Sequence, residues 1–584
     1  MRKVVTIIAA MVLVGLSILP YDDASGAPAG GVFQGAWPYQ TPPAGHYNSF
    51  IPGYLIPFVN PYNDLVEMPL AFYLWQKNEY IPVLATQWKV EAGGRAFTVF
   101  LRPGVRWSDG SAFTSADVAS TFYVGYLFGF LAWRSISGIE TPNDQTVVFR
   151  FTTPASIALR TIMRVNIRPR SVYAALADRA KPFAEQRMAL TDEPVRTLTD
   201  DVRRFRPRES VATGPFRIDA SSITEAQLTL VKNPTSFAAN QVQFDRVVLF
   251  NGETPQITPI ALAKQIDYAT HAFPPATDRQ FQELGIRVLR APVYSGPALF
   301  FNHRISPLNR KEVRQAISYA VNRDQTGTVA LAASGKGVKM LTGFSDNLAD
   351  NWLTADVRGK LNPYRYDPAR GAQILTRIGF RKGPDGVWVS DQGERMEYEL
   401  SVPPEFADWS AAAEDVASQL NRFGIRITVR GVANPQHVLN VNEGRFQIAF
   451  RSWGAGNPHP FFSFTQDLFN HNYVVNAVTR GMDFNLRQGT DAMGNVDMAS
   501  MVDSSGAGTN IARQKSAVSR LALAFNELLP IIPLFERYSN SPVAEGVRVT
   551  GWPRDDDPIY KNHLGTDSFV TIMIFNGTLR PAGR

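Results

Sequence analysis

Apolar residues recur at every second position from residue 97 to residue 107, and this pattern predicts a β-hairpin. Phe97, Val99 and Leu101 fall on one face of an extended segment, and Val105 and Trp107 resume the alternation. Between the two runs lies a Pro-Gly pair, which is a frequent turn sequence. We therefore expect two paired strands joined at residues 103 and 104.

A helix is predicted to follow this hairpin. Thr114 and Asp117 have the spacing of a capping box, in which the hydroxyl accepts from a free backbone amide and the carboxylate reaches back. Val118 and Phe122 then recur at helical spacing and should face the core.

The rest of the chain mixes helical and strand periodicities, which predicts an α/β protein. Apolar positions from 313 to 321 and from 411 to 423 have helical spacing, and Gly424 ends the second helix. Ile425, Ile427 and Val429 alternate as in a strand, and residues 444–450 form another strand that leads to Trp453. Residues 481–510 are polar and rich in glycine, which predicts a loop or a weakly ordered segment.

Two motifs carry a resemblance to a known family. The run Leu-Arg-Pro-Gly-Val-Arg-Trp-Ser-Asp-Gly at 101–110, followed by Thr-x-x-Asp-Val at 114–118, resembles the signature of the family 5 extracellular solute-binding proteins of ABC importers. Pro-x-Leu-Ala-x-x-Trp at 82–88 and Thr-Gly-Pro-Phe at 213–216 are similar to further segments of that family. The resemblance touches most of residues 65–540.

The resemblance implies a fold and a domain organisation. The fold is α/β, similar to the type II periplasmic binding proteins, with two lobes joined by a hinge and an extra domain as in peptide-binding proteins. The expected domains follow in chain order: signal peptide 1–27, domain I 28–73, domain II 74–208, domain I again 209–290, domain III 291–532 as the second lobe, and domain I again 533–584.

The first 27 residues have the pattern of an export signal. Arg2 and Lys3 precede an apolar stretch from Val4 to Leu19, and small residues follow at 24–27. The chain has no cysteine, so it has neither a disulfide nor a lipid-bearing N-terminal cysteine. We therefore expect a protein that is exported to the periplasm or the extracellular space, with an uncleaved anchor as the alternative.

Composition and charge narrow the possible functions. The 584 residues are 45% hydrophobic and 11% aromatic, which is typical of a well-packed globular protein. The net charge is +7, but Lys and Arg are scattered among Asp and Glu, so nucleic-acid binding is not expected. The seven histidines lack metal-ligand spacing and no nucleophile motif is present, so we expect no metal, no cofactor and no catalytic residues.

The expected ligand site lies after the strand that ends at Trp453. In peptide-binding members of the family, the equivalent Trp is followed three residues later by an Asp that meets the amino terminus of the peptide. Here that position is Gly456, so the ammonium group of a peptide has lost its expected partner. Aromatic faces and uncharged hydrogen-bonding groups suit a sugar equally well. The candidate ligand-binding residues are Trp453, Trp37, Asn457, His459, Tyr294 and Trp133.

These observations predict the substrate-binding component of an ABC transporter. It would capture an oligopeptide or an oligosaccharide between its lobes and deliver it to a membrane permease, as a monomer and without catalysis. Two alternatives stay open. One is a secreted hydrolase that acts on oligosaccharides or peptides, and the other is a receptor that presents its ligand to a signalling protein.

Overall fold

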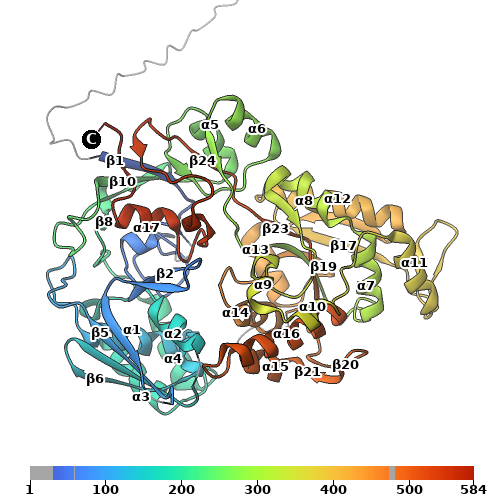
Figure 1. Ribbon diagram of the computed structural model, residues 1–584, viewed down its shortest axis with the longest axis horizontal. Helices are drawn as coiled ribbons and strands as arrows, with labels where there is room; N and C mark the ends of the chain where they lie inside the picture. The colour runs from blue at the N-terminus through green and yellow to red at the C-terminus, as the bar shows by residue number, and fades with distance from the viewer. Residues whose placement is uncertain (1–30, 58–59, 92, 155, 473–480, 584) are drawn as a thin grey trace, which may run out of the picture.

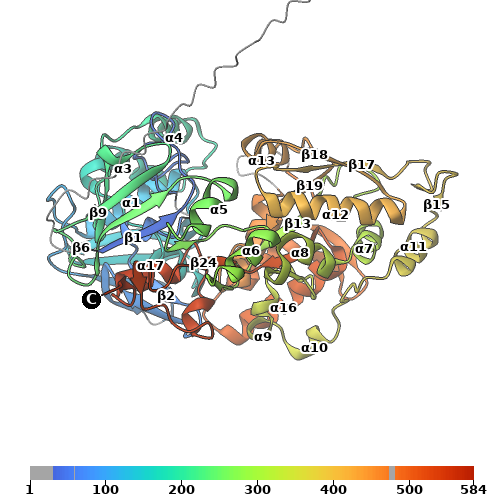
Figure 2. The same ribbon diagram turned by 90° about the horizontal axis from the view of Figure 1, so that it is seen from above.

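The computed structural model describes residues 31–57, 60–91, 93–154, 156–472 and 481–583. It contains two lobes that lie side by side (Figure 1), and the same division is visible from above (Figure 2). The expected two-lobed α/β architecture is therefore confirmed. The predicted signal peptide lies outside the described residues.

The first lobe contains a seven-stranded sheet built from distant parts of the chain. Strand β1 (Gly31–Ala36) lies near its centre and runs parallel to β10 (Phe244–Phe250) and to β11 (Tyr268–Ala269). The sheet order is β12-β24-β11-β1-β10-β9-β8. The other strands are β8 (Phe216–Asp219), β9 (Gln227–Lys232), β12 (Arg287–Leu289) and β24 (Ser541–Val543). Such a sheet forms only when both ends of the chain have come together.

A second, four-stranded sheet completes the first lobe. It has the antiparallel order β4-β5-β7-β6, with strands β4 (Ala85–Val90), β5 (Ala96–Leu101), β6 (Ile136–Asn143) and β7 (Thr146–Phe151). Helix α1 (Ser115–Leu127) follows β5, and the predicted capping box is confirmed: the backbone amide of Thr114 donates to Asp117 at 2.7 Å.

The predicted hairpin at 97–107 is wrong in its second strand. Strand β5 is bordered on both edges, by β4 and by β7, so the chain after the Pro-Gly turn has no free edge to pair with. Residues 105–107 form only a single bridge, between Arg106 and Ala112. Val105 and Trp107 are nevertheless buried in the core of the lobe. Their alternation reflects burial, not strand pairing.

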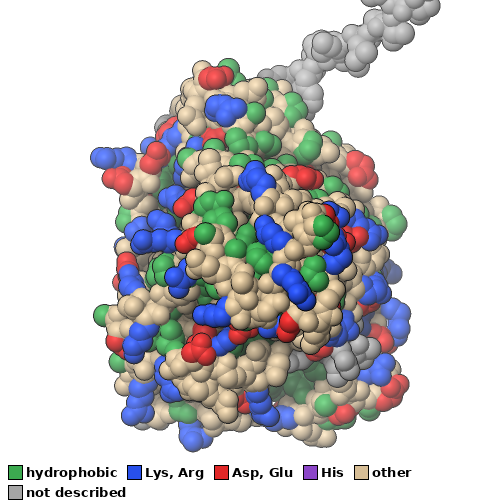
Figure 3. All heavy atoms as spheres, turned by 90° about the vertical axis from the view of Figure 1, so that its right-hand side faces the viewer, with side chains coloured by type: hydrophobic (Ala, Val, Ile, Leu, Met, Phe, Trp, Pro, Cys, Tyr) green, Lys and Arg blue, Asp and Glu red, His purple; other side chains and the backbone are tan. Residues whose placement is uncertain are grey.

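The second lobe is built on a five-stranded sheet of order β18-β17-β19-β13-β22. Its strands are β13 (Gly296–Phe301), β17 (Glu397–Val402), β18 (Arg426–Gly431), β19 (Ile448–Trp453) and β22 (Ile531–Pro533). The predicted helices are present as α7 (Lys311–Ala320) and α12 (Ala407–Phe423), and Gly424 caps α12 in the left-handed conformation. Over the face shown in Figure 3, Lys and Arg side chains are interspersed with Asp and Glu side chains.

The segment 481–510 is more ordered than its composition indicated. It contains a hairpin of β20 (Arg487–Thr490) and β21 (Gly494–Asp497), followed by helix α15 (Met498–Gly506). The carboxylate of Asp497 caps α15. The hairpin is mostly exposed and the helix buries one narrow side, so few apolar residues are needed and the sequence pattern is weak.

Two neighbouring segments connect the lobes. One links β12 to β13 and the other links β22 to β24. They run antiparallel, and their hydrogen bonds include Val293 N to Arg537 O at 2.9 Å and Ser539 N to Ala291 O at 2.7 Å. A pair of extended segments that passes between two lobes can bend as a hinge. The predicted domain boundaries at residues 74, 209, 291 and 533 stay predictions.

Candidate functional site

A buried carboxylate and two arginines form the base of the contact between the lobes. Helix α2 (Ser156–Met163) presents Arg160, and Arg164 follows one turn later. Asp567 is fully buried and forms ion pairs with both: Arg160 Nη2 lies 2.5 Å from Oδ2, and Arg164 Nε lies 2.6 Å from Oδ1. The indole nitrogen of Trp75 donates to the same carboxylate at 2.7 Å. The negative charge of Asp567 is therefore fully matched.

Arg160 also reaches the second lobe. Its Nε donates to Oδ1 of Asn457 at 3.1 Å. Asn457 lies in the loop that follows β19, and the start of this loop is anchored because Gly454 N donates to the buried carboxylate of Asp467 at 3.1 and 3.2 Å. The Nη1 atom of Arg160 is buried and has no hydrogen-bond partner among the described residues.

His563 occupies the space beside Gly456. A Cβ atom on Gly456 would lie 2.4 Å from His563 Nε2, and Gly456 has a φ of +50°. The Nδ1 atom of His563 accepts from the backbone amides of Gly565 and Thr566 at 3.0 and 3.1 Å, which places the ring proton on Nε2. Burial lowers the pKa of His563 to about 4, so the imidazole is neutral at pH 7 and offers one N–H beside Gly456.

Aromatic rings border these polar groups. The ring of Trp75 lies 4.4 Å from that of Tyr294 and is stacked on His563 at 6.2 Å. The Tyr294 hydroxyl donates to Lys561 O at 2.6 Å and so links the connecting segment to the first lobe. The guanidinium of Arg160 lies 5.0 Å from the centre of the Tyr73 ring. We call the following six residues the interlobe cluster: Trp75, Arg160, Tyr294, Asn457, His563 and Asp567.

Two of the six predicted site residues belong to this cluster, namely Asn457 and Tyr294. His459 lies close by in sequence but has a local role: its Nδ1 accepts from Phe461 N at 3.1 Å and caps helix α14 (Pro460–Thr465). Its ring contacts Trp352 at 4.1 Å, and burial lowers its pKa to about 4.

The three predicted tryptophans lie outside the cluster. Trp453 is fully buried in the core of the second lobe, and its indole nitrogen donates to Phe535 O at 3.4 Å. Trp133 is buried in the first lobe and donates to Phe122 O at 2.7 Å. Trp37 is half-buried and extends β1 through a backbone bond to Phe250 O. Contact of these rings with a ligand stays a prediction.

Sequence reasoning missed four members of the cluster: Trp75, Arg160, His563 and Asp567. One signal was available, because Arg160 and Arg164 have the four-residue spacing of one helix face. Their partner Asp567 lies about 400 residues further along the chain, with no local pattern that marks it.

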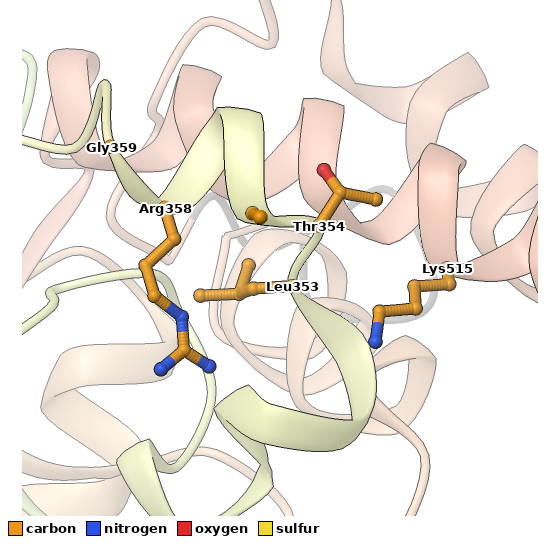
Figure 4. A pocket seen from close by; sticks show the side chains of 6 residues that line it. Leu353, Thr354, Arg358, Gly359 and Lys515 are labelled. Atoms are coloured by element: carbon orange, nitrogen blue, oxygen red, sulfur yellow. The ribbon is translucent and has the colours of Figure 1, made fainter.

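A separate hollow lies on the outer surface of the second lobe (Figure 4). It is lined by Leu353, with Arg358 and Lys515 on either side. Both cations already have a partner, since Arg358 pairs with the Asp350 carboxylate at 2.7 Å and Lys515 donates to Asp350 O at 3.2 Å. The charge of Arg358 is therefore matched by a carboxylate, whereas Lys515 is held by a backbone carbonyl and keeps its positive charge.

The comparisons with known proteins place the chain in a family. Residues 79–473 match the family model of bacterial extracellular solute-binding proteins, family 5, middle region, so the chain belongs to this family. A dipeptide-binding protein of Escherichia coli strain K12 is 23% identical over 434 residues, which cover 69% of this chain and 72% of that protein.

Solved structures share the fold. A periplasmic oligopeptide-binding protein of Thermotoga maritima, solved with mannohexaose bound, has a TM-score of 0.74 and 17% identity, over 96% of this chain and 100% of that one. The oligopeptide-binding protein AppA of Bacillus subtilis, in complex with a nonapeptide, has a TM-score of 0.69 and 17% identity, over 92% and 98%. Within the described residues, no helix has both the length and the apolar character of a membrane span.

Proposed function

We propose that the protein captures an uncharged oligosaccharide between its lobes and delivers it to the permease of an ABC importer. One observation carries this choice: the charges of the interlobe cluster are already matched. Asp567 is held by two arginines, and the position beside Asn457 carries Gly456 and the neutral ring of His563. An ammonium group entering the cluster would find no free carboxylate, and burying it unpaired would be costly.

The groups that stay available suit hydroxyl groups and sugar rings. Arg160 Nη1 is a free donor whose positive charge is already balanced by Asp567, and the ring N–H of His563 is a second donor. The partly exposed ring of Trp75 supplies an apolar face against which a sugar ring can pack. A ligand that contacts both Arg160 and Asn457 would favour the closed form, because these residues belong to different lobes.

An oligopeptide is the second candidate ligand. Two of the similar proteins support it, since one is a dipeptide-binding protein and the other was solved in complex with a nonapeptide. The Thermotoga relative, described as an oligopeptide-binding protein, was solved with mannohexaose, which supports the first candidate.

A ligand panel separates the two candidates. Purified protein is heated with mannohexaose, with other oligosaccharides and with oligopeptides of matched length that have a free amino terminus and uncharged side chains, and the melting temperature is recorded. We expect stabilisation by oligosaccharides, because a ligand that binds only the folded state raises its stability. Stabilisation by peptides alone would contradict the sugar proposal and leave the family assignment intact.

We further propose that the protein acts in the periplasm or outside the cell, as a monomer and without catalysis. The family description, extracellular solute-binding protein, supports the location. Prolonged incubation of the stabilising ligand with the protein, followed by mass spectrometry, tests the absence of turnover. A shortened product would favour the hydrolase alternative, and a chemoreceptor as binding partner in place of a permease would favour the signalling alternative.

A further inference from the structure

The beginning of helix α2 is bonded directly to the second lobe. Ser156 N donates to Gly508 O at 2.8 Å, and Gly508 N donates back to Pro154 O at 2.8 Å. Gly508 lies between α15 and α16 (Ile511–Leu528), so these backbone bonds join the two lobes. In Figure 1, α15 extends from the second lobe toward α2.

Side chains reinforce this junction. The Ser156 hydroxyl donates to Gln514 Oε1 at 3.2 Å and accepts from Gln514 Nε2 at 2.8 Å. Gln514 is almost completely buried, and its amide also donates to Gly508 O at 3.1 Å. The amide therefore holds the loop of its own lobe and the hydroxyl of the other lobe together. We call Ser156, Gly508 and Gln514 the clasp.

An apolar contact lies next to the clasp. Ile157 packs against the cores of both lobes. A Cβ atom on Gly506 would lie 2.8 Å from Ile157 Cδ1 and 2.7 Å from a carbon of the Phe461 ring, so only glycine permits this close approach. The surfaces of the lobes therefore pack closely at this point.

The clasp consists only of bonds between protein groups. Its member Ser156 lies one helical turn before Arg160 on α2. None of its three residues belongs to the interlobe cluster. Each net hydrogen bond of this kind favours the closed form by an amount that does not depend on what fills the cleft.

We propose that the clasp closes the cleft without ligand, so that a measurable fraction of the unliganded protein is closed. This goes beyond the proposed ligand class and holds for a sugar and for a peptide alike. Because only the closed form makes the full set of ligand contacts, the clasp sets the affinity for every ligand by the same factor.

A distance measurement on the unliganded protein tests the proposal. The chain has no cysteine, so Glu193→Cys and Arg487→Cys introduce two unique spin-label sites, one on each lobe, at side chains that are 84% and 81% exposed. Pulsed electron double resonance then gives the distribution of distances between the labels. The measurement is made on the labelled parent and on the same protein with Ser156→Ala, with Ser156→Ala/Gln514→Ala, or with Ser504→Ala.

We expect a short and a long distance in the parent, with the ratio of short to long falling about fivefold in Ser156→Ala, which corresponds to one hydrogen bond of about 1 kcal/mol. In Ser156→Ala/Gln514→Ala the ratio of short to long distances should fall further. Among the described residues, the Ser504 hydroxyl bonds only within α15, to Ser500 O, so Ser504→Ala should match the parent. A parent with the long distance alone, or a ratio that is the same in all four proteins, would overturn the proposal. Both outcomes are independent of the ligand class.

Discussion

At the scale of single residues, the ligand class depends on what stands beside Asn457. Gly456 leaves room for His563, and the neutral imidazole offers a donor where a carboxylate would attract an ammonium group. The two residues therefore act as a pair. Gly456→Asp alone does not create a peptide site, because the His563 ring already fills the space.

Substitution of Gly456 tests this pairing. We expect Gly456→Asp to lower the free energy of unfolding by about 1–3 kcal/mol, since its Cβ would meet the His563 ring at 2.4 Å. Gly456→Asp/His563→Ala should recover part of that loss and gain affinity for an oligopeptide with a free amino terminus. Urea unfolding and calorimetric titration measure the two effects.

Gly104→Asp is the matched control for this substitution. Gly104 also has a positive φ, of +73°, but a Cβ there would meet nothing within 4 Å. Gly104→Asp should therefore lower the free energy of unfolding only through the strain of the backbone conformation. Equal losses for Gly104→Asp and Gly456→Asp would mean that the contact with His563 has no energetic weight.

Trp453 offers a second test at this scale. Because its ring is fully buried in the second lobe, we expect Trp453→Ala to lower the free energy of unfolding by about 3–5 kcal/mol, more than Trp37→Ala at a half-buried position. Trp453→Phe keeps most of the packing. A Trp453→Phe protein that stays stable but no longer binds ligand would establish the predicted ligand contact.

Sequence reasoning found the residues of the site that lie near a recognisable motif and missed those defined by distant contacts. Asn457 follows the strand that leads to Trp453, and the resemblance pointed to that loop. The bond from Arg160 to Asn457 spans 297 positions, and the pair with Asp567 spans 407. Periodicity describes one element at a time, so it cannot indicate which carboxylate neutralises which arginine.

At the scale of elements, α2 carries both the site and the clasp. Ser156 and Ile157 at its start contact the second lobe, and Arg160 one turn later belongs to the interlobe cluster. Arg164 at the next turn fixes Asp567 and Asp64. A helix of eight residues thus couples closure to the cleft through its regular spacing alone.

Removal of the Asp567 charge should destabilise this arrangement. We expect Asp567→Asn to lower the free energy of unfolding by about 3–5 kcal/mol, because Arg160 and Arg164 would keep buried charges without their shared partner. The exposed pair Arg170–Asp178 provides the control: Asp178→Asn should cost less than about 1 kcal/mol. Urea unfolding compares the two variants, and similar losses would contradict a special role of the buried pair.

Local rules predicted elements well where the local signal and the tertiary environment agree. The capping box of α1 and the glycine that ends α12 were both correct. The strand predicted at 105–107 failed because both edges of β5 were already paired, and this depends on strands about 10 and 45 residues away. The prediction for residues 481–510 was wrong in the opposite direction, because it gave a loop where the structure has a hairpin and a helix. Exposed elements need few apolar residues, so the sequence pattern did not indicate them.

At the scale of the whole molecule, binding depends on the balance between open and closed forms. The two antiparallel connecting segments permit bending, while the clasp and the Arg160–Asn457 bond favour closure. The clasp and the Arg160–Asn457 bond contribute regardless of the ligand, and the other groups of the interlobe cluster contribute only when a ligand fits. Affinity and specificity therefore have separate structural sources in this chain.

The stability of the whole molecule should also include a contribution from Glu536 that falls as the pH rises toward neutrality. Glu536 lies on β23 (Phe535–Arg537), beside the segment that returns to the first lobe, and burial raises the pKa of its carboxyl to about 7 from its ordinary value of 4.5. Between these two values the folded protein binds the proton and the unfolded chain does not. The free energy of unfolding therefore decreases with rising pH in this window, by roughly 3 kcal/mol for this group.

Glu536→Gln isolates this effect. The amide keeps an oxygen that can accept the bond from Asn347 Nδ2, now 2.6 Å long, but it cannot ionise. We expect the variant to be more stable than the parent at pH 8 and closest to it near pH 4.5, as measured by urea unfolding across the range. Glu193→Gln, at a side chain that is 84% exposed, should keep the pH dependence of the parent. If Glu536→Gln also kept it, the buried carboxyl would already be ionised in the folded protein at the lower pH, held by its hydrogen bonds despite burial.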